Sequence, residues 1–290
     1  MKIKIITDST SNLTAELVEQ YDIDIIPAFA IIDEKEYIDD GSTPPAAFYE
    51  LIANSKSAKT SMPSPQNVLN VLEDNLDYDH LLMIHVSTLL SGTINVVQSV
   101  IKQFKRNNKN APKITIFDSK GSSYFLGAIA IKAAQLVRHE LSLEEIIKQL
   151  EDFRDDDVQV LLTVTDLTHI FQSGRIGRIQ YHLADLLHAY PILTLVDGAL
   201  KAVSKDIGSE RTCRKLINIF TDFYEKDDEV TLWYAETVPS ETNDQFRQML
   251  DEIQEPKIKQ IIPFKVGNAI VCHTGTTVMG IISARNFDLD

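Results

Sequence analysis

The chain has little of several residue types that mark common classes of protein. Its 290 residues include only two cysteines, Cys213 and Cys272. Their spacing fits neither a C-x-x-C redox motif nor a zinc site. No apolar run approaches the roughly 18 residues of a membrane span, and the apolar part of MKIKIITDST is too short for a signal peptide. We therefore expect reduced, buried thiols in a cytoplasmic protein.

Positive charge is also scarce. The chain carries 28 Lys and Arg against 42 Asp and Glu, a formal net charge of −14. Without a basic stripe, this balance argues against a nucleic-acid partner and is typical of a soluble surface. Hydrophobic residues make up 44% of the chain and charged residues 24%, as in ordinary globular proteins. The length favours two domains or one large one.

The fingerprints of nucleotide and metal chemistry are missing. The sequence has no G-x-x-x-x-G-K-[ST], no G-x-G-x-x-G and no H-E-x-x-H. Its seven histidines are scattered, without i,i+4 pairs beside carboxylates, so neither a metal nor another cofactor is predicted. G-x-S-x-G is absent as well, because Ser91 follows two leucines and precedes a single glycine.

The first half alternates between buried strand-like runs and helical patterns. Each expected strand is followed by a polar turn and then by a helix, which predicts a parallel sheet with crossovers in a domain of residues 1–156. The three strands end in similar small polar tips, and ligands collect at such ends. The expected strands are 2–7, 80–86 and 113–118, the helices 13–21, 94–104 and 124–140, and the tips Asp8-Ser9-Thr10, Ser87-Thr88 and Asp118-Ser119.

The second half has a different pattern. Ser142 opens a capping box with Glu145, and the acidic run 154–157 is interpreted as a solvated linker. Beyond it we predict an α+β domain of residues 157–290, with a hairpin around Asp197-Gly198. The expected strands are 158–164, 192–205 in two runs, 229–236, 258–266 and 269–275; the expected helices are 209–226 and 241–253.

Two loops rich in small hydroxyl residues precede expected helices. TSMPSP carries Thr60, Ser61 and Ser64, and LLSGTIN carries Ser91, Gly92 and Thr93. Unsatisfied N–H groups and the helix dipole at such a start can bind a carboxylate or phosphate without a lysine. From the residues alone, three interpretations stay open: a capping loop, an anion-binding site, or an active site with a nucleophilic serine.

Two further segments carry candidate functional residues. His273 in VCHTGTTVMG stands between an expected strand and a glycine turn, where a histidine serves either structure or catalysis. Arg175 and Arg178 belong to the glycine-rich HIFQSGRIGRIQ. Arginines in such a segment form ion pairs or recognise a partner more often than they catalyse.

Taken in order, these motifs resemble one family. Asp-Ser-Thr at the first strand end, TSMPSP, SGT, FDSKGSS, SGRIGR, PILTLVDG and HTG together resemble the DegV family of bacterial fatty-acid-binding proteins. The resemblance implies a two-domain α/β fold with a lipid tunnel between the domains that holds one long-chain fatty acid. It also implies that the fatty-acid carboxylate binds to Thr60, Ser91 and His273, with Ser61, Gly92 and Thr93 as the supporting loop.

The same resemblance implies a partner. Family members present the acyl chain to a separate fatty-acid kinase, so the chain itself is expected to be a binding subunit without catalysis, and Arg175 is expected to contact the kinase. A transient contact with a membrane surface is compatible with this role. The chain has Ser173 where the family usually has glycine, and Thr276-Thr277 where it usually has proline and glycine.

Two alternatives remain. One is a lipid hydrolase or acyltransferase that uses Ser91 with His273 as base, and the other is a lipid sensor without a kinase partner. The sequence does not set the acyl length, because that depends on the shape of the tunnel.

Overall fold

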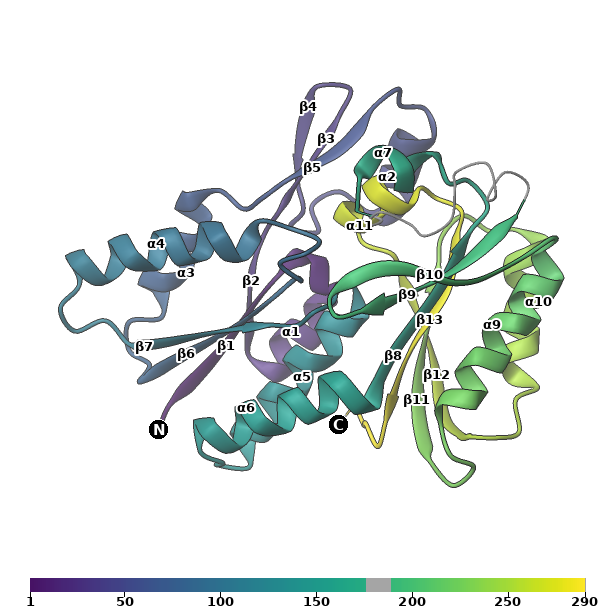
Figure 1. Ribbon diagram of the computed structural model, residues 1–290. Helices are drawn as coiled ribbons and strands as arrows, with labels where there is room; N and C mark the ends of the chain where they lie inside the picture. The colour runs from purple at the N-terminus through teal and green to yellow at the C-terminus, as the bar shows by residue number, and fades with distance from the viewer. Residues whose placement is uncertain (176–188, 290) are drawn as a thin grey trace. The chain divides into compact units, whose positions relative to one another are not determined.

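The computed structural model describes residues 1–175 and 189–289 and divides the chain into two compact units (Figure 1). The first unit is Met1–Pro44 with Lys56–Asp156, and the second is Pro45–Ser55 with Asp157–Asp290. The division after Asp156 coincides with the sequence-based boundary. Residues 45–55 do not follow that boundary, because they belong to the second unit.

The first unit is built on a parallel sheet in the order β2-β1-β6-β7. Helices α3 and α4 pack on one face, and α5 lies against β1 and β6 from the other, with α1 and α6 beside it (Figure 1). The predicted parallel α/β arrangement is confirmed. The strands are β1 (Ile3–Asp8), β2 (Ile23–Ile26), β6 (His80–His85) and β7 (Lys113–Asp118); the helices are α1 (Ala15–Tyr21), α3 (Pro65–Asp74), α4 (Thr93–Asn107), α5 (Tyr124–Arg138) and α6 (Leu143–Asp152).

The central strands explain why this sheet forms. Every residue of β1 and β6 is buried, as expected for parallel strands covered on both faces. Ile6, Leu81 and Met83 pack against apolar side chains of α3 and α4. Because the carboxyl ends of these strands share one edge, the loops that follow β1, β6 and β7 gather there.

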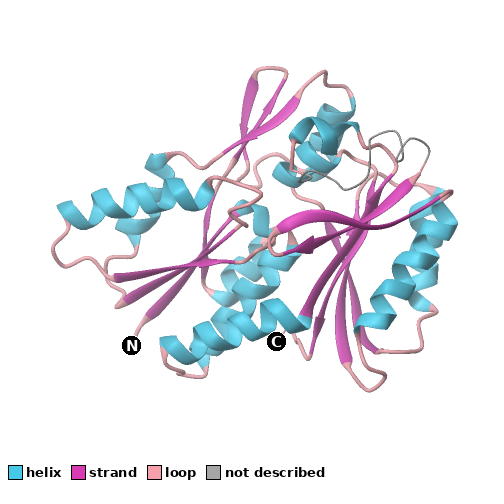
Figure 2. Ribbon diagram, in the orientation of Figure 1, coloured by secondary structure: helices cyan, strands magenta, loops and turns pink. Residues whose placement is uncertain are grey.

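A second sheet in this unit was not predicted. β3 (Phe29–Ile32), β4 (Lys35–Ile38) and β5 (Ala58–Ser61) form an antiparallel sheet in the order β4-β3-β5 (Figure 2). Each strand has only four residues, too few to show a clear alternation of apolar and polar positions. The sheet matters for function because β5 ends at Ser61, within the first hydroxyl loop.

The second unit contains a mixed six-stranded sheet in the order β10-β9-β8-β13-β11-β12. Helices α9 and α10 cover one face with a core that includes Phe220 and Phe246. The predicted hairpin is confirmed, with positive φ at both Asp197 and Gly198. The elements are β8 (Val158–Val164), β9 (Tyr190–Val196), β10 (Ala199–Asp206), β11 (Glu229–Glu236), β12 (Lys257–Lys265), β13 (Val278–Arg285), α9 (Ser209–Phe223) and α10 (Glu241–Asp251).

One expected strand of this unit is wrong. Residues 269–274 of this segment belong to helix α11 (Asn268–Thr274), which has Gly267 and Gly275 at its two caps. A short apolar run such as Ala-Ile-Val-Cys fits either a buried strand or a buried helix. The flanking glycines and the packing of α11 against α2 (Pro45–Ala53) and α7 (Thr168–Ser173) favour the helix. The strand that follows, β13, was missed.

The expected linker at 154–157 is also wrong. The predicted capping box is present, since Ser142 accepts from Glu145 N and Glu145 accepts from Ser142 N. The chain then continues from α6 into a π-helical turn, η2 (Phe153–Asp157), whose Phe153 is buried. Arg154 pairs with Asp155 at 2.7 Å within this turn. The acidic residues are therefore part of a helical end and not of an extended linker.

Residues 45–55 join the second unit through α2. Tyr49 is buried and its hydroxyl donates to the carbonyl oxygen of Val266 at 2.7 Å. Burial raises the pKa of this phenol well above its ordinary range. Sequence patterns within 45–55 carry no sign of a partner more than 200 positions away, so this attachment cannot be inferred from the sequence.

Candidate functional site

The first hydroxyl loop connects β5 to α3. Thr60 and Ser61 are half-buried at the end of β5, where Thr60 pairs with Ala30 of β3. Ser64 is the N-cap of α3, and its hydroxyl accepts from the backbone N–H of Asn67 at 3.0 Å. Capping therefore accounts for Ser64 but not for Thr60 and Ser61.

The second hydroxyl loop connects β6 to α4 and differs from the first in how the following helix is capped. The N-cap of α4 is Gly92, which has no side chain to cap the helix. Ser91 Oγ lies 2.9 Å from Thr93 Oγ1 and accepts from Thr93 N at 3.3 Å. Ser91 is half-buried, whereas Thr93 is 3% exposed. The hydroxyl groups thus gather at the positive end of a 15-residue helix.

The two loops touch each other. A Cβ atom built on Gly92 would lie only 2.6 Å from Sδ of Met62, so the Met62 side chain lies directly against this glycine. Gly92 has φ of −81°, which any residue adopts, so the feature that sets this glycine apart is the close contact with Met62 and not its backbone conformation. The contact brings Thr60 and Ser61, just before Met62, into the neighbourhood of Ser91.

Two carboxylates hold the segment that leads to Ser91. Oδ2 of Asp8, at the end of β1, lies 3.0 Å from Nδ1 of His85 and accepts from Val86 N at 3.0 Å. Asp118, at the end of β7, accepts from the hydroxyl of Thr88 at 2.7 Å. Asp8 and Asp118, the strand-end acids predicted to share a crevice, thus both form hydrogen bonds with the segment 85–88. His85 was not among the predicted site residues, although it ends an apolar strand next to the strand of Asp8.

His273 and Arg175 belong to the second unit. His273 is half-buried in the last turn of α11. Burial, and next the positive charge of Arg175, lowers the pKa of His273 from 6.5 to about 4, so its imidazole is neutral near pH 7. Arg175 is exposed, and its guanidinium donates to the carbonyl oxygen of Ser173 at 2.6 Å. The electrostatic link between Arg175 and His273 was not predicted. Arg178 lies outside the described residues.

Comparison with known proteins decides the family. A family model described as DegV, an uncharacterised protein family, matches residues 2–286. The chain belongs to the DegV family. A DegV domain-containing protein of Clostridium perfringens is 32% identical over 285 residues, which is 97% of each chain. The resemblance inferred from the ordered motifs is confirmed.

Solved DegV structures share the fold over the full chain. A DegV family protein from Thermus thermophilus, described by its fatty-acid binding, has a TM-score of 0.88 at 25% identity and covers 98% of this chain and 100% of its own. DegV from Bacillus subtilis, described as a fatty-acid-binding protein, has a TM-score of 0.85 at 25% identity and covers 99% and 100%. The α/β fold predicted from the DegV resemblance is confirmed.

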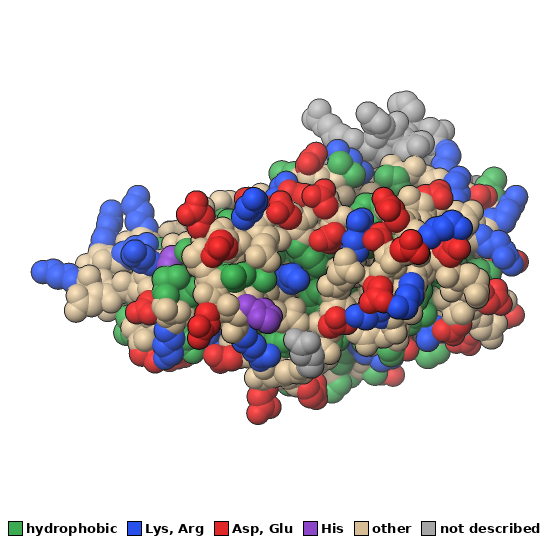
Figure 3. Space-filling model, turned by 90° about the horizontal axis from the view of Figure 1, so that it is seen from below, with side chains coloured by type: hydrophobic (Ala, Val, Ile, Leu, Met, Phe, Trp, Pro, Cys, Tyr) green, Lys and Arg blue, Asp and Glu red, His purple; other side chains and the backbone are tan. Residues whose placement is uncertain are grey.

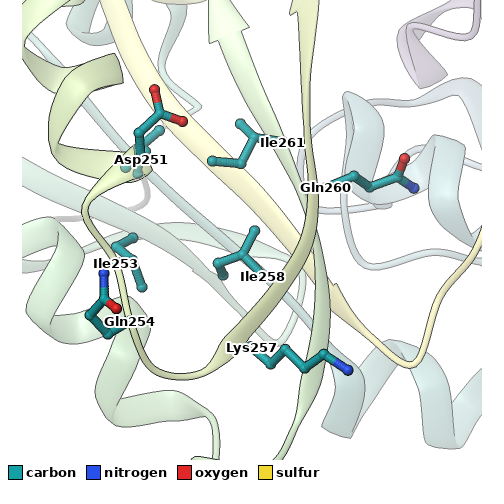
Figure 4. Close-up of a pocket in the computed structure, with 8 residues that line it drawn as sticks. Asp251, Ile253, Gln254, Lys257, Ile258, Gln260 and Ile261 are labelled. Carbon is teal, nitrogen blue, oxygen red and sulfur yellow. The ribbon is translucent and has the colours of Figure 1, made fainter.

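A pocket of about 370 Å³ lies elsewhere, in the second unit (Figure 4). Ile253, Ile258 and Ile261 line it between the end of α10 and the edge strand β12, whereas the side chain of Gln260 points away from them. None of the predicted carboxylate-binding residues lines this pocket. Four of its eight lining residues are polar, among them the acidic Asp251, and no helix N-terminus with hydroxyl residues belongs to it, so we do not assign the acid site to this pocket.

Charge is unevenly distributed on the first unit. The segment 80–117 contains five basic residues and no Asp or Glu. Lys and Arg side chains gather at the end of this unit where α4 and β7 meet (Figure 3). The five residues are exposed: Lys102, Lys105, Arg106, Lys109 and Lys113. Within the part of the chain that the structure describes, no helix combines the length and apolar character needed to cross a membrane.

Proposed function

We propose that the protein binds one long-chain fatty acid and that the carboxylate lies at the paired hydroxyl loops of the first unit. The observation that carries this proposal is the contact between Met62 and Gly92, which joins the loop of Thr60 to the loop of Ser91. Both sets of hydroxyl groups then serve one anion, at the start of a helix whose N-cap has no side chain. We call these paired hydroxyl loops the carboxylate seat, and Ser61 and Thr93 support it.

The chemistry of the seat suits a carboxylate. A buried carboxylate without partners would be costly, whereas hydroxyl and backbone N–H donors can stabilise it without a fixed cation. The positive end of the α4 dipole adds to this effect. A tail of about sixteen carbons, at about 0.8 kcal/mol per buried CH₂, supplies on the order of 10 kcal/mol before the cost of ordering is subtracted. The tail thus provides affinity, and the seat fixes the position of the head.

The named relatives support the same ligand class. The Thermus thermophilus and Bacillus subtilis proteins are both described as fatty-acid-binding, and both match over almost the whole of this chain. His273, the third residue implied by the DegV resemblance, stays a prediction as a carboxylate contact. With its pKa lowered to about 4, it would offer a hydrogen bond near pH 7 and no charge. The apolar tunnel also stays a prediction.

We further propose that the chain is a binding subunit and that a separate fatty-acid kinase uses the bound acid to make an acyl-phosphate. The exposed guanidinium of Arg175 supports a role at a partner surface, where arginines are frequent anchors. The basic end of α4 would allow a transient contact with an anionic membrane surface. A lipid sensor without a kinase partner remains the alternative to this part of the proposal.

Native mass spectrometry of freshly purified protein tests the central proposal. We expect a mass increase that corresponds to one fatty acid, and denaturing extraction should release the free acid unchanged. Delipidated protein should then take up one equivalent of palmitate or oleate. Protein that is empty after expression in lipid-replete cells, and that binds neither acid on addition, would disprove fatty-acid binding.

A further inference from the structure

The end of β6 holds a buried imidazole with one ring nitrogen engaged and the other not. The side chain of His85 is 0% exposed, and its Nδ1 lies 3.0 Å from Oδ2 of Asp8. Its Nε2 is enclosed by protein and has no hydrogen-bond partner among the residues that the structure describes. Leaving such an atom without a partner costs free energy, so this nitrogen calls for an explanation.

The other histidine of the same strand provides a comparison. His80, at the opposite end of β6, is also buried, but its Nε2 lies 2.8 Å from Oγ1 of Thr115. The two imidazoles therefore differ in whether the protein itself supplies the second partner. The one left open is at the carboxyl end of a parallel strand, which is where ligands bind in sheets of this kind.

The direction of His85 follows from the alternation along the strand. Leu81, Met83 and His85 point to the same face of the sheet, and Leu81 and Met83 pack against α3 and α4. His85 therefore faces the layer of α3 and α4, at the end where both helices begin. The hydroxyl loops with Thr60 and Ser91 lead into those two helix starts.

A second buried polar atom stands at the same end of this layer. Asn67 is the third residue of α3, and its side-chain Nδ2 is buried with no hydrogen-bond partner in residues 1–175 or 189–289. Val71, one turn further along α3, packs against the same core as Leu81 and Met83, and residues four apart share a helix face. The amide of Asn67 thus faces the layer into which His85 points.

We propose that Nε2 of His85 and Nδ2 of Asn67 bind the carboxyl group of the ligand, together with Thr60 and Ser91. This inference rests on the proposed fatty-acid binding and adds two head-group contacts to it. Asp8 accepts from Val86 N and from Thr10 N, as an ionised carboxylate does, so Nδ1 of His85 carries the proton that points to Asp8.

Each carboxyl oxygen of the ligand then has one of the two buried nitrogen atoms as its hydrogen-bond partner. Nε2 of His85 shares one proton with a carboxyl oxygen of the ligand, and that proton comes from the solvent when the fatty acid arrives ionised. Nδ2 of Asn67 donates to the second oxygen. Both of the buried atoms gain a partner, and the imidazole bridges Asp8 and the ligand. Asp8 is a positioning residue in this arrangement, because it fixes the ring without touching the ligand.

Imidazole NMR of the wild-type protein tests the contact directly. The protein is labelled with ¹⁵N-histidine, delipidated and titrated with one equivalent of [1-¹³C]palmitate. We expect the Nε2 resonance of His85 to shift, because its hydrogen bonding changes, while the Nε2 resonance of His80 stays in place. The bound ¹³C-carboxyl resonance shows in the same sample whether palmitate has bound.

The outcomes separate this inference from the proposed function. If the carboxyl resonance reports bound palmitate and His85 does not respond, the two additional contacts are wrong and fatty-acid binding stands. If palmitate does not bind, both fall. Affinity provides a second measurement: His85→Gln and Asn67→Leu should each weaken palmitate binding by about tenfold or more. The matched control His80→Gln should remain within about twofold, and equal losses in all three variants would overturn the inference.

Discussion

The side-chain oxygens of Ser91 and Thr93 lie 2.9 Å apart at the start of α4, in front of a glycine N-cap. Each hydroxyl can rotate to donate to a common acceptor. In contrast, the hydroxyl of Ser64 is used within the protein as the cap of α3. The two helix starts are similar in sequence, yet their hydroxyl groups differ in role: that of Ser64 caps a helix, whereas those of Ser91 and Thr93 can donate to a common acceptor.

Alanine variants should distinguish hydroxyl groups that bind the ligand from a hydroxyl group that only caps a helix. Thr60→Ala and Ser91→Ala each remove a donor to a charged group, so we expect each to weaken palmitate binding by roughly 1.5–3 kcal/mol without unfolding the protein. The double variant should lose less than the sum, because both donors share one carboxylate. Ser64→Ala is the matched control: calorimetry should show unchanged affinity, with a loss of about 1 kcal/mol in stability. Unchanged affinity in both single variants would place the carboxylate elsewhere.

The close approach of Met62 to Gly92 predicts a rescue. In Gly92→Ala the new Cβ would meet Sδ of Met62 at 2.6 Å, so the Met62 side chain must shift and the present contact between the two loops is lost. We expect weaker palmitate binding in Gly92→Ala and recovery of most of the affinity in the double variant Gly92→Ala, Met62→Ala. Titration calorimetry of the wild type, Gly92→Ala, Met62→Ala and the double variant measures this coupling. Equal affinity of Gly92→Ala and the wild type would show that the contact between the loops does not position the seat.

His273 should make stability depend on pH in a defined window. Its pKa is 6.5 in the unfolded chain and about 4 in the folded protein, so between these values the unfolded state binds more protons. The free energy of unfolding therefore falls as the pH drops from about 7 to 4, by at most about 3 kcal/mol from this residue. The full contribution is present above pH 6.5 and is lost as the pH falls through 4. Urea unfolding of His273→Gln should show a flatter profile than the wild type across this window, and parallel profiles would contradict the burial of a neutral imidazole.

The role of Arg175 can be tested by two independent measurements, the pKa of His273 and the rate of acyl-phosphate formation. Its charge contributes to the low pKa of His273, so Arg175→Ala should raise that pKa, which NMR titration of the imidazole would show. If Arg175 also contacts the kinase, the same variant should retain palmitate and lower the rate of acyl-phosphate formation with kinase and ATP. Loss of palmitate binding in Arg175→Ala would instead assign the arginine to the pocket or to the fold.

The elements with strong local patterns were predictable from the sequence. β7 and β11 match the expected strands residue for residue, and the capping box at Ser142 and the hairpin at Asp197-Gly198 are both present. In each case the determinants are neighbours along the chain: a buried run between turn residues, a hydroxyl three residues before a glutamate, or a dipeptide that accepts positive φ.

The features that could not be predicted depend on distant partners. The attachment of residues 45–55 to the second unit requires Val266 to meet Tyr49, and the helix 268–274 requires its packing against α2 and α7. At the candidate site, the two hydroxyl loops were singled out from the sequence because hydroxyl residues cluster there, whereas the DegV resemblance named Thr60 and Ser91, whose role stays a prediction. His85 was not found, because a histidine in an apolar strand shows no sign of a missing partner until Asp8 and its other neighbours are placed.

The last prediction distinguishes a carrier from a hydrolase at Ser91. A nucleophilic serine needs a base within hydrogen-bond reach, and the imidazole of His85, held by Asp8, is the kind of base that hydrolases use. However, Nε2 of His85 bonds to no serine within the described parts of the chain, and the side-chain partner of Ser91 Oγ is Oγ1 of Thr93, at 2.9 Å. We therefore expect that a fluorophosphonate probe does not label the protein and that it does not hydrolyse p-nitrophenyl palmitate. Ser91→Ala should then lower affinity with no catalytic rate to lose. Stoichiometric labelling at Ser91, with ester hydrolysis abolished in Ser91→Ala and in either His85→Gln or His273→Ala, would replace the carrier by an enzyme.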